Sequence, residues 1–213
     1  MRPVNRGLFL DLDGTVIITK SGKTFPVDKD DWQFNPGILE RIEKYVDLGW
    51  TILIVTNQGG IEAGHVIMND FRQKIRKIIG EIITSTGCPF SRIAYRFSMS
   101  NNPDDFYRKP NPGMGYDLAM SHILNLSESI MVGDASGKLR RKETVYHDES
   151  SPSGWSYKDG QFVAQVDVIR IAQYLTSGIL EFYDHADSDL KFAKACGMTY
   201  IDIQDFLKQE DNG

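Results

Sequence analysis

The feature that most constrains this fold is the alternation of short, almost entirely apolar segments with longer amphipathic ones. The apolar segments at residues 7–10, 51–55 and 130–132 are bounded by turn residues and are too short for typical helices. Between such segments, residues 38–46 and 69–86 carry apolar side chains at helical spacing. Repeated strand–helix–strand units with apolar strands predict the α/β class, here a doubly wound, Rossmann-like parallel sheet with helices on both faces.

The alternation is interrupted over residues 138–183. This stretch opens with basic residues, continues through a loop rich in Ser, Pro and Gly, and only then regains an amphipathic pattern. The 213 residues, with 41% hydrophobic content, are suited to one core. We therefore expect a single domain spanning residues 1–213, with an insertion at about 138–183 and no large cap domain.

Composition narrows the partners and the compartment. The formal net charge of −5 gives no general attraction to polyanions, so any nucleic-acid contact must come from a local basic patch. Cys88 and Cys196 form neither a disulfide framework nor a metal-ligand pattern, and the first predicted strand leaves no room for a signal peptide before it. No apolar stretch has the length of a membrane span. We expect a cytoplasmic protein that does not bind membranes.

Polar side chains follow several of the predicted strands. Asp11 and Asp13 end the first strand, Thr56 follows the second, Lys109 precedes a helix, and Asp134 follows the strand at 130–132. The carboxyl ends of parallel strands share one edge of the sheet, where ligands bind. Carboxylates can hold Mg²⁺, while Thr56 and Lys109 can contact phosphoryl oxygens. This set is suited to a phosphate ester, although an Asp-Gly turn alone could explain the first two acids.

Four motifs occur in an order that resembles the haloacid dehalogenase (HAD) superfamily of phosphatases. They are Asp11-Leu12-Asp13-Gly14-Thr15, then Thr56, Lys109 and finally Gly133-Asp134. The resemblance implies that Asp11 is a nucleophile that forms an aspartyl-phosphate, and that Asp13 protonates the leaving alcohol and then activates water. It also implies a Mg²⁺ cofactor bound by the Asp11 carboxylate, the Asp13 backbone carbonyl and Asp134. Lys109 would bind the phosphate and keep Asp11 charged.

The fourth motif departs from the usual superfamily pattern. A second acid normally follows Gly-Asp within a few residues, but here the local stretch is "GDASGKLRR". The segment "DLKFAKACGM" at 189–198 looks like the helix that follows this acid, so we infer that the insertion splits the motif and that Asp189 completes the metal site. Asp184 and Asp187 remain alternatives, and the whole acidic cluster could merely cap the helix.

Further segments resemble the 3′-phosphatase domain of polynucleotide kinase-phosphatases. They are "DLDGTVIITKSGKTFP" followed by Asp31-Trp32, "TNQGGIEAG", "YRKPNPGM" and the tail at 184–207. This likeness implies removal of 3′-phosphates from DNA or RNA ends, as in DNA repair. It also implies a role in substrate binding for five residues, namely Thr15, Lys23, Asn57, Gln58 and Arg108.

Two other functions stay open at this point. Histidinol-phosphate and heptose-bisphosphate phosphatases share several of these features, although they often carry a cysteine-rich zinc loop that two distant cysteines cannot form. A non-catalytic phosphate-binding module is a third possibility, but it would need no nucleophile with an acid–base pair. No G-x-x-x-x-G-K-[ST] kinase loop occurs in the sequence.

A polymer substrate would need contacts beyond the reacting phosphate. The candidate partners for backbone phosphates are Lys20, Lys23, Lys138, Arg140, Arg141 and Lys142. Trp32 or Trp155 could stack on a base. Each also has a simpler interpretation, because loop charges are usually solvated and tryptophans usually pack.

Overall fold

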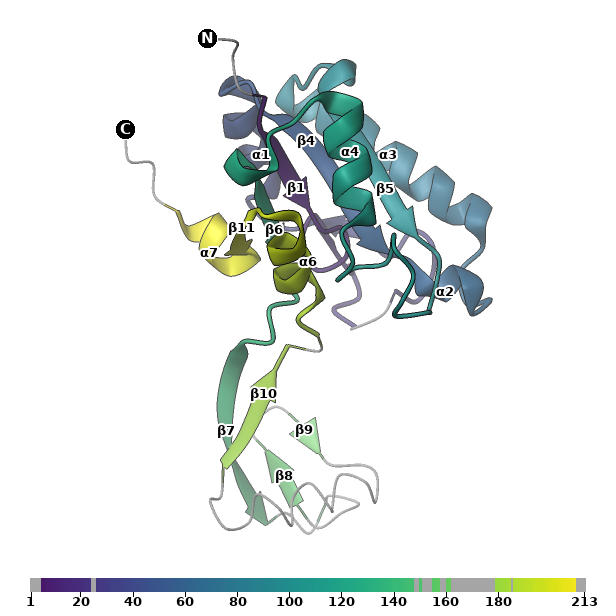
Figure 1. Cartoon of the computed structure of the whole chain (residues 1–213). Helices are drawn as coiled ribbons and strands as arrows, with labels where there is room; N and C mark the ends of the chain where they lie inside the picture. Colours follow the sequence, from purple (N-terminus) through teal and green to yellow (C-terminus); the bar gives the residue numbers. More distant parts are fainter. Residues whose placement is uncertain are drawn as a thin grey trace. The chain divides into compact units, whose positions relative to one another are not determined.

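The computed structural model describes residues 5–23, 26–147, 150, 155–157, 160–161, 179–184 and 186–209. The chain divides into two compact units, of which the first combines Met1–Ser136 with Asp187–Gly213 and the second is Gly137–Ala186. The first unit is built on a five-stranded sheet with the strand order β11-β6-β1-β4-β5 (Figure 1). Its strands are β1 (Gly7–Leu10), β4 (Thr51–Asn57), β5 (Ile93–Ser98), β6 (Ile130–Gly133) and β11 (Thr199–Asp202).

All neighbouring strands in this sheet are parallel, and side chains alternate between its two faces. In β1, Leu8 and Leu10 belong to one core, whereas Phe9 belongs to the other. The same alternation divides β4, where Ile52 packs with the first core and Leu53 with the second. Because every strand residue of β1 is buried, these strands read as continuous apolar runs in the sequence.

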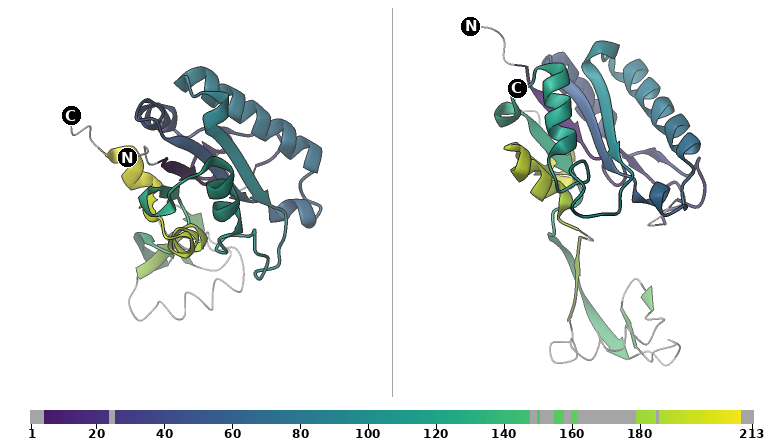
Figure 2. Two further views of the ribbon diagram at one scale, coloured as in Figure 1. Left: turned by 45° about the horizontal axis from the view of Figure 1, so that its top comes forward. Right: turned by 45° about the vertical axis from the view of Figure 1, so that its right-hand side comes forward.

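Helices cover both faces of the sheet, as Figures 1 and 2 show. The first core is shared with α1 (Ile38–Asp47), α3 (Met68–Thr86) and α7 (Ile203–Lys208). The second core is shared with α4 (Gly113–His122) and α6 (Ser188–Cys196). The predicted doubly wound α/β fold is therefore confirmed. Among the described residues, every helix is too short or too polar to cross a membrane.

After β1, a loop connects the two strands of a small antiparallel pair, β2 (Ile17–Ile18) and β3 (Gln33–Phe34). The Asp31 carboxylate organises this loop, since it accepts hydrogen bonds from the Val27 backbone N–H (2.9 Å) and from the N–H (2.8 Å) and hydroxyl (2.7 Å) of Ser21. These bonds, led by that from Val27, lower the pKa of Asp31.

Trp32 packs in the protein core instead of presenting its ring to a ligand. Its side chain lies edge-on to Phe34 with ring centroids 5.8 Å apart, and only 7% of the residue is exposed. The idea that Trp32 could stack on a base is therefore wrong, because the apolar residues around it already bury the ring.

The second unit contains an antiparallel sheet with the order β10-β7-β8-β9. Its strands are β7 (Leu139–His147), β8 (Trp155–Tyr157), β9 (Gly160–Gln161) and β10 (Ile179–Tyr183). Arg140 forms an ion pair with Asp184 inside this unit. The side chains of Arg141, Lys142 and Trp155, which the sequence marked as candidate contacts, lie outside what the structure describes.

Candidate active site

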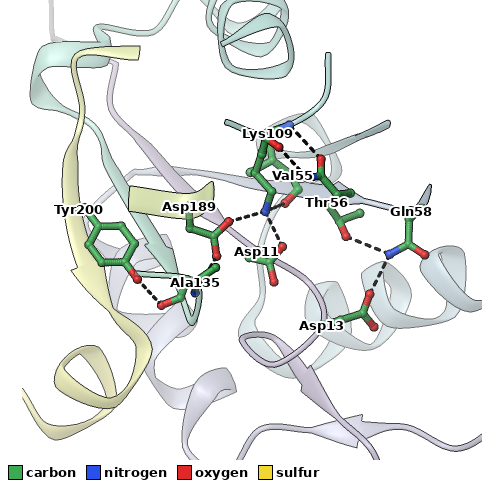
Figure 3. Close-up of polar contacts among 11 residues, drawn as sticks. Asp11, Asp13, Val55, Thr56, Gln58, Lys109, Ala135, Asp189 and Tyr200 are labelled. Carbon is green, nitrogen blue, oxygen red and sulfur yellow. Dashed lines mark hydrogen bonds and ion pairs between the residues drawn. The ribbon is translucent and has the colours of Figure 1, made fainter. Parts of the chain in front are cut away.

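The centre of the candidate site is the ammonium group of Lys109. Its Nζ lies 2.5 Å from Oδ1 of Asp11, 2.7 Å from Oδ1 of Asp189 and 3.0 Å from the carbonyl oxygen of Val55 (Figure 3). A lysine ammonium has three N–H donors, so these three acceptors match its capacity. Lys109 is only 3% exposed, which means that these contacts replace water.

The charges of this group influence one another strongly. Burial alone would lower the pKa of Lys109, but the carboxylates of Asp11 and Asp189 outweigh burial and raise it. Burial raises the pKa of Asp11 well above its ordinary value, and the negative charges of Asp189 and Asp134 add to this effect while Lys109 opposes it. Lys109 is thus held in its cationic form, and the neighbouring negative charges make ionisation of Asp11 less favourable.

Asp11, Asp134 and Asp189 form a cluster that could hold a metal ion. Each offers a carboxylate oxygen, and these oxygens all lie within 4.8 Å of one another. Carboxylate oxygens brought this close repel one another, and a divalent cation among them would offset that repulsion. A small oxygen-rich cluster of this kind fits Mg²⁺.

Two glycines make room for these carboxylates. A Cβ atom on Gly133 would lie 2.2 Å from Oδ2 of Asp189, and one on Gly14 would lie 2.2 Å from Oδ2 of Asp134. Gly14 also has a backbone φ of 88°, which residues other than glycine rarely adopt. Gly14 and Gly133, the glycines of the first and fourth motifs, therefore leave open the space that the Asp134 and Asp189 carboxylates occupy.

Of the three alternative acids in the tail, Asp189 is the one that joins the cluster. It is 1% exposed in the first turn of α6, and its Oδ2 accepts a hydrogen bond of 3.2 Å from the Ala135 backbone N–H. Asp187 instead forms an ion pair of 2.8 Å with Lys191. Asp184 forms its ion pair with Arg140.

Asn57 holds the backbone of Lys109. Its Nδ2 donates to the Lys109 carbonyl oxygen and its Oδ1 accepts from the Lys109 N–H, each at 2.9 Å. The sequence suggested a substrate contact for Asn57, but both ends of its amide are used to place the lysine. This pair of bonds links the end of β4 to the loop that carries Lys109.

Asp13 lies on the other side of Thr56 from Lys109 in Figure 3, and a chain of contacts connects it to the site. The Nε2 group of Gln58 donates to Asp13 Oδ2 at 2.7 Å and to Thr56 Oγ1 at 2.9 Å. Because the Thr56 oxygen accepts this bond, its own O–H is available to donate to a phosphoryl oxygen. Lys74 Nζ lies 3.4 Å from the other oxygen of Asp13. The sequence analysis assigned no role to Lys74.

The remaining predicted substrate contacts have different surroundings. Thr15 is completely buried, so its side chain offers no accessible surface to a ligand in this structure. Arg108 donates to the Ser100 carbonyl oxygen at 2.6 Å, within the loop that precedes Lys109. Lys23 is exposed, and its carbonyl oxygen accepts a hydrogen bond from the Thr19 hydroxyl.

Two exposed aromatic residues precede Arg108 and were missed by the sequence analysis. Phe106 and Tyr107 are 54% and 44% exposed, and their rings lie edge-on with centroids 5.8 Å apart. The signal that could have found them is a pair of aromatic residues inside the polar stretch "NNPDDFYR". Exposed aromatic rings can stack on a nucleobase, and these two directly precede Arg108 and Lys109 in the chain.

Comparison with known proteins places this site in a family. The sequence profile described as "Polynucleotide kinase 3 phosphatase" matches residues 8–207. The chain belongs to this family. Its 3′-phosphatase profile covers both the Asp11 motif and the Asp189 helix, so the segments that the insertion separates are matched together.

Relatives of this polynucleotide kinase 3 phosphatase family member act on different substrates. The chain is 32% identical over 135 residues to a D-glycero-beta-D-manno-heptose-1,7-bisphosphate 7-phosphatase of Helicobacter pylori, covering 63% of this chain and 76% of that protein. It is 30% identical over 145 residues to a bifunctional polynucleotide phosphatase/kinase of Schizosaccharomyces pombe, covering 65% of this chain but 32% of that protein. The first name is that of a sugar phosphatase and the second that of a nucleic-acid enzyme.

Two further matches complete the comparison. A 20.8 kDa uncharacterised protein of Autographa californica nuclear polyhedrosis virus is 34% identical over 131 residues, and the match covers 61% of this chain and 65% of the viral protein, just under two thirds. A solved structure of D,D-heptose 1.7-bisphosphate phosphatase from B. bronchiseptica, complexed with magnesium and phosphate, is 27% identical, with a TM-score of 0.51 over 62% of this chain and 71% of that one. The predicted HAD-type phosphatase is thus confirmed.

Proposed function

We propose that this HAD-type phosphatase is Mg²⁺-dependent and removes 3′-phosphates from nucleic-acid ends. The observation that carries the proposal is the buried Lys109 ammonium, held between Asp11 and Asp189 with Asp134 in the same carboxylate cluster. Such a group matches a phosphate dianion with a nucleophile, a cation and a metal site in one place.

The residues support a two-step reaction through an aspartyl-phosphate. In the first step, a carboxylate oxygen of Asp11 forms a bond to phosphorus, the bond to the leaving oxygen breaks, and Asp13 gives that oxygen a proton. In the second step, water attacks the same phosphorus and Asp13 takes its proton, which releases inorganic phosphate and restores Asp11. Thr56 and Lys109 would donate hydrogen bonds to the phosphoryl oxygens as their charge develops.

The residues that would hold Mg²⁺ are Asp11, Asp134 and Asp189, and the resemblance to HAD phosphatases adds the Asp13 backbone carbonyl as a further oxygen ligand. When bound, the ion would supply the positive charge that allows an anionic carboxylate to approach an anionic phosphate. Lys109 would complement the ion by placing a second positive charge beside the Asp11 and Asp189 carboxylates.

Two observations favour a polymer end as the substrate. The family profile spans nearly the whole chain, and the exposed rings of Phe106 and Tyr107 directly precede Arg108 and Lys109. Stacking on aromatic rings tolerates any base, which suits an enzyme that acts on ends of unspecified sequence.

A small phosphorylated sugar is the second candidate. It is favoured by the likeness to the Helicobacter pylori phosphatase and to the solved structure from B. bronchiseptica. The chemistry at Asp11 would be the same, and only the surface around the site would bind a different leaving group.

The test is phosphate release with Mg²⁺ from a 3′-phosphorylated oligonucleotide, its 5′-phosphorylated twin and heptose 1,7-bisphosphate, with Asp11→Asn as the blank. We expect kcat/KM for the 3′-end to exceed the others by about a hundredfold, or roughly 3 kcal/mol of transition-state discrimination. A similar advantage for the sugar would overturn the polymer substrate, and equal release by Asp11→Asn would overturn the covalent mechanism.

A further inference from the structure

Asp13 is held from two sides, although it stands on a partly exposed loop. Gln58 Nε2 donates to its Oδ2 at 2.7 Å, and Lys74 Nζ lies 3.4 Å from its Oδ1. The Asp13 side chain is 47% exposed, so without these partners it would be free to rotate among several orientations. Both of its oxygens are instead occupied by side chains from different elements.

Lys74 comes from the middle of α3, far from the loop in sequence. Its side chain is only 14% exposed. Phe71, Ile75 and Ile78 of the same helix are buried in the first core and fix α3 against the sheet. The lysine stem is therefore anchored on a rigid element, and its charged end reaches the active-site loop.

Fold stability gives a poor explanation of this contact. An ion pair with a half-exposed carboxylate adds little to stability, because water screens it and two side chains lose freedom. The buried neighbours on α3 already supply the packing that holds the helix. A lysine whose side chain is only 14% exposed and whose ammonium faces Asp13 is better explained by what the pair does to Asp13.

We propose that Lys74, acting with Gln58, is a positioning residue that holds the Asp13 carboxylate in the orientation for proton transfer to the leaving oxygen. Gln58 uses its second N–H on Thr56, so the same amide ties Asp13 to a residue expected to contact the phosphoryl group. Catalytic groups must be fixed closely for proton transfer to be efficient. The inference rests on the proposed function, because it takes Asp13 as the general acid.

The experiment measures how kcat/KM depends on the leaving group. The substrates are 2,4-dinitrophenyl, 4-nitrophenyl and phenyl phosphate, whose leaving oxygens need increasing help from a proton donor. Lys74→Met should stay within about twofold of wild type for the dinitrophenyl ester and lose at least about tenfold for the phenyl ester. Lys74→Arg, which keeps a cationic donor, should recover part of this loss.

Three controls keep the outcomes distinct. Lys77→Met removes a lysine one turn along α3, which lies over the Trp32 ring at 5.4 Å, and should behave as wild type. Asp13→Asn should show the same leaving-group trend as Lys74→Met, but more steeply. Thermal unfolding of Lys74→Met should match wild type, which separates a loss of positioning from a loss of folding.

Each other outcome counts against a defined part of the proposal. If Lys74→Met slows all three esters equally, or only raises KM, while Asp13→Asn keeps its trend, Lys74 does not position the acid. If Asp13→Asn itself shows no trend, the acid–base role of Asp13 in the proposed function fails, and the inference fails with it.

Discussion

Nζ of Lys109 lies 2.5 Å from Oδ1 of Asp11, and the same ammonium reaches Asp189 at 2.7 Å. One buried cation thus forms ion pairs with two buried anions that come from opposite ends of the chain. The two contacts tie the end of β1 to the first turn of α6.

Lys109→Met should destabilise the protein when metal is chelated. Removing the ammonium leaves the carboxylates of Asp11 and Asp189 buried without a counter-charge, which we expect to cost about 3 kcal/mol of unfolding free energy. Urea unfolding in EDTA measures this loss, and added Mg²⁺ should recover part of it. A variant as stable as wild type in EDTA would show that the ion pair is not needed to keep the acids together.

Asp11→Asn should be more stable than wild type in EDTA at neutral pH, and the difference should depend on pH. Burial raises the pKa of Asp11 above its ordinary 3.8, so between these two values the folded carboxyl keeps a proton that the unfolded chain has lost. Across that window the wild type loses about 1.4 kcal/mol of stability per pH unit from this group, and the variant does not.

Urea unfolding of both proteins from about pH 4 to about pH 8 gives the comparison. The advantage of Asp11→Asn should grow with pH and become constant above the folded pKa of Asp11. Curves that run parallel over the whole range would contradict the raised pKa.

Gly133→Ala should weaken Mg²⁺ binding by steric displacement of Asp189. The added Cβ would lie 2.2 Å from Asp189 Oδ2, and Gly133 has no left-handed backbone that would confuse the result. We expect Mg²⁺ affinity to fall by about tenfold or more, as when a group that orients a ligand is lost. Calorimetric titration with Mg²⁺ measures the change.

Gly80→Ala is the matched control for this substitution. Gly80 lies within α3 and has no atom within 4 Å of an added Cβ, so alanine should stabilise the helix by about 0.5 kcal/mol and leave Mg²⁺ binding unchanged. If both alanine variants bind Mg²⁺ as wild type does, Asp189 does not need the space beside Gly133.

Tyr107→Ala should reduce activity on oligonucleotides more than on small phosphates. Loss of base stacking is worth about 1 to 3 kcal/mol, so KM for a 3′-phosphorylated oligonucleotide should rise by about tenfold. Tyr107→Phe keeps the ring and should retain the wild-type KM. A loss by Tyr107→Ala that is equal for 4-nitrophenyl phosphate would mean that the ring supports the loop instead of the substrate.

The sequence predicted the centre of the site because a parallel sheet places the carboxyl ends of its strands along one edge. Asp11, Lys109 and Asp134 each stand next to a strand or helix that could be recognised by its apolar pattern, and the structure brings them together. Asp189 required a further step, since its helix had to be reconnected across an insertion. That reasoning depended on a resemblance and not on spacing alone.

Other features could not be predicted because they depend on packing in three dimensions. Nothing in the local sequence distinguishes Lys74 from Lys77, the other lysine of α3, and only the approach of the helix to Asp13 gives Lys74 a role. Trp32 looks the same in sequence whether it packs or stacks, and its burial in the first core decides between them. Asn57 likewise follows a strand like any ligand-binding residue, but its amide bonds the Lys109 backbone through both its nitrogen and its oxygen.

The position of β1 within the sheet has a consequence for local unfolding. With the order β11-β6-β1-β4-β5, β1 is the central strand and has a hydrogen-bonded neighbour on each side. Amide hydrogens in such a strand exchange with solvent only in the rarest openings, whereas edge strands fray more readily. The backbone that carries Asp11 should therefore be among the last to exchange, so the proposed nucleophile would keep its place while the edges of the sheet fluctuate.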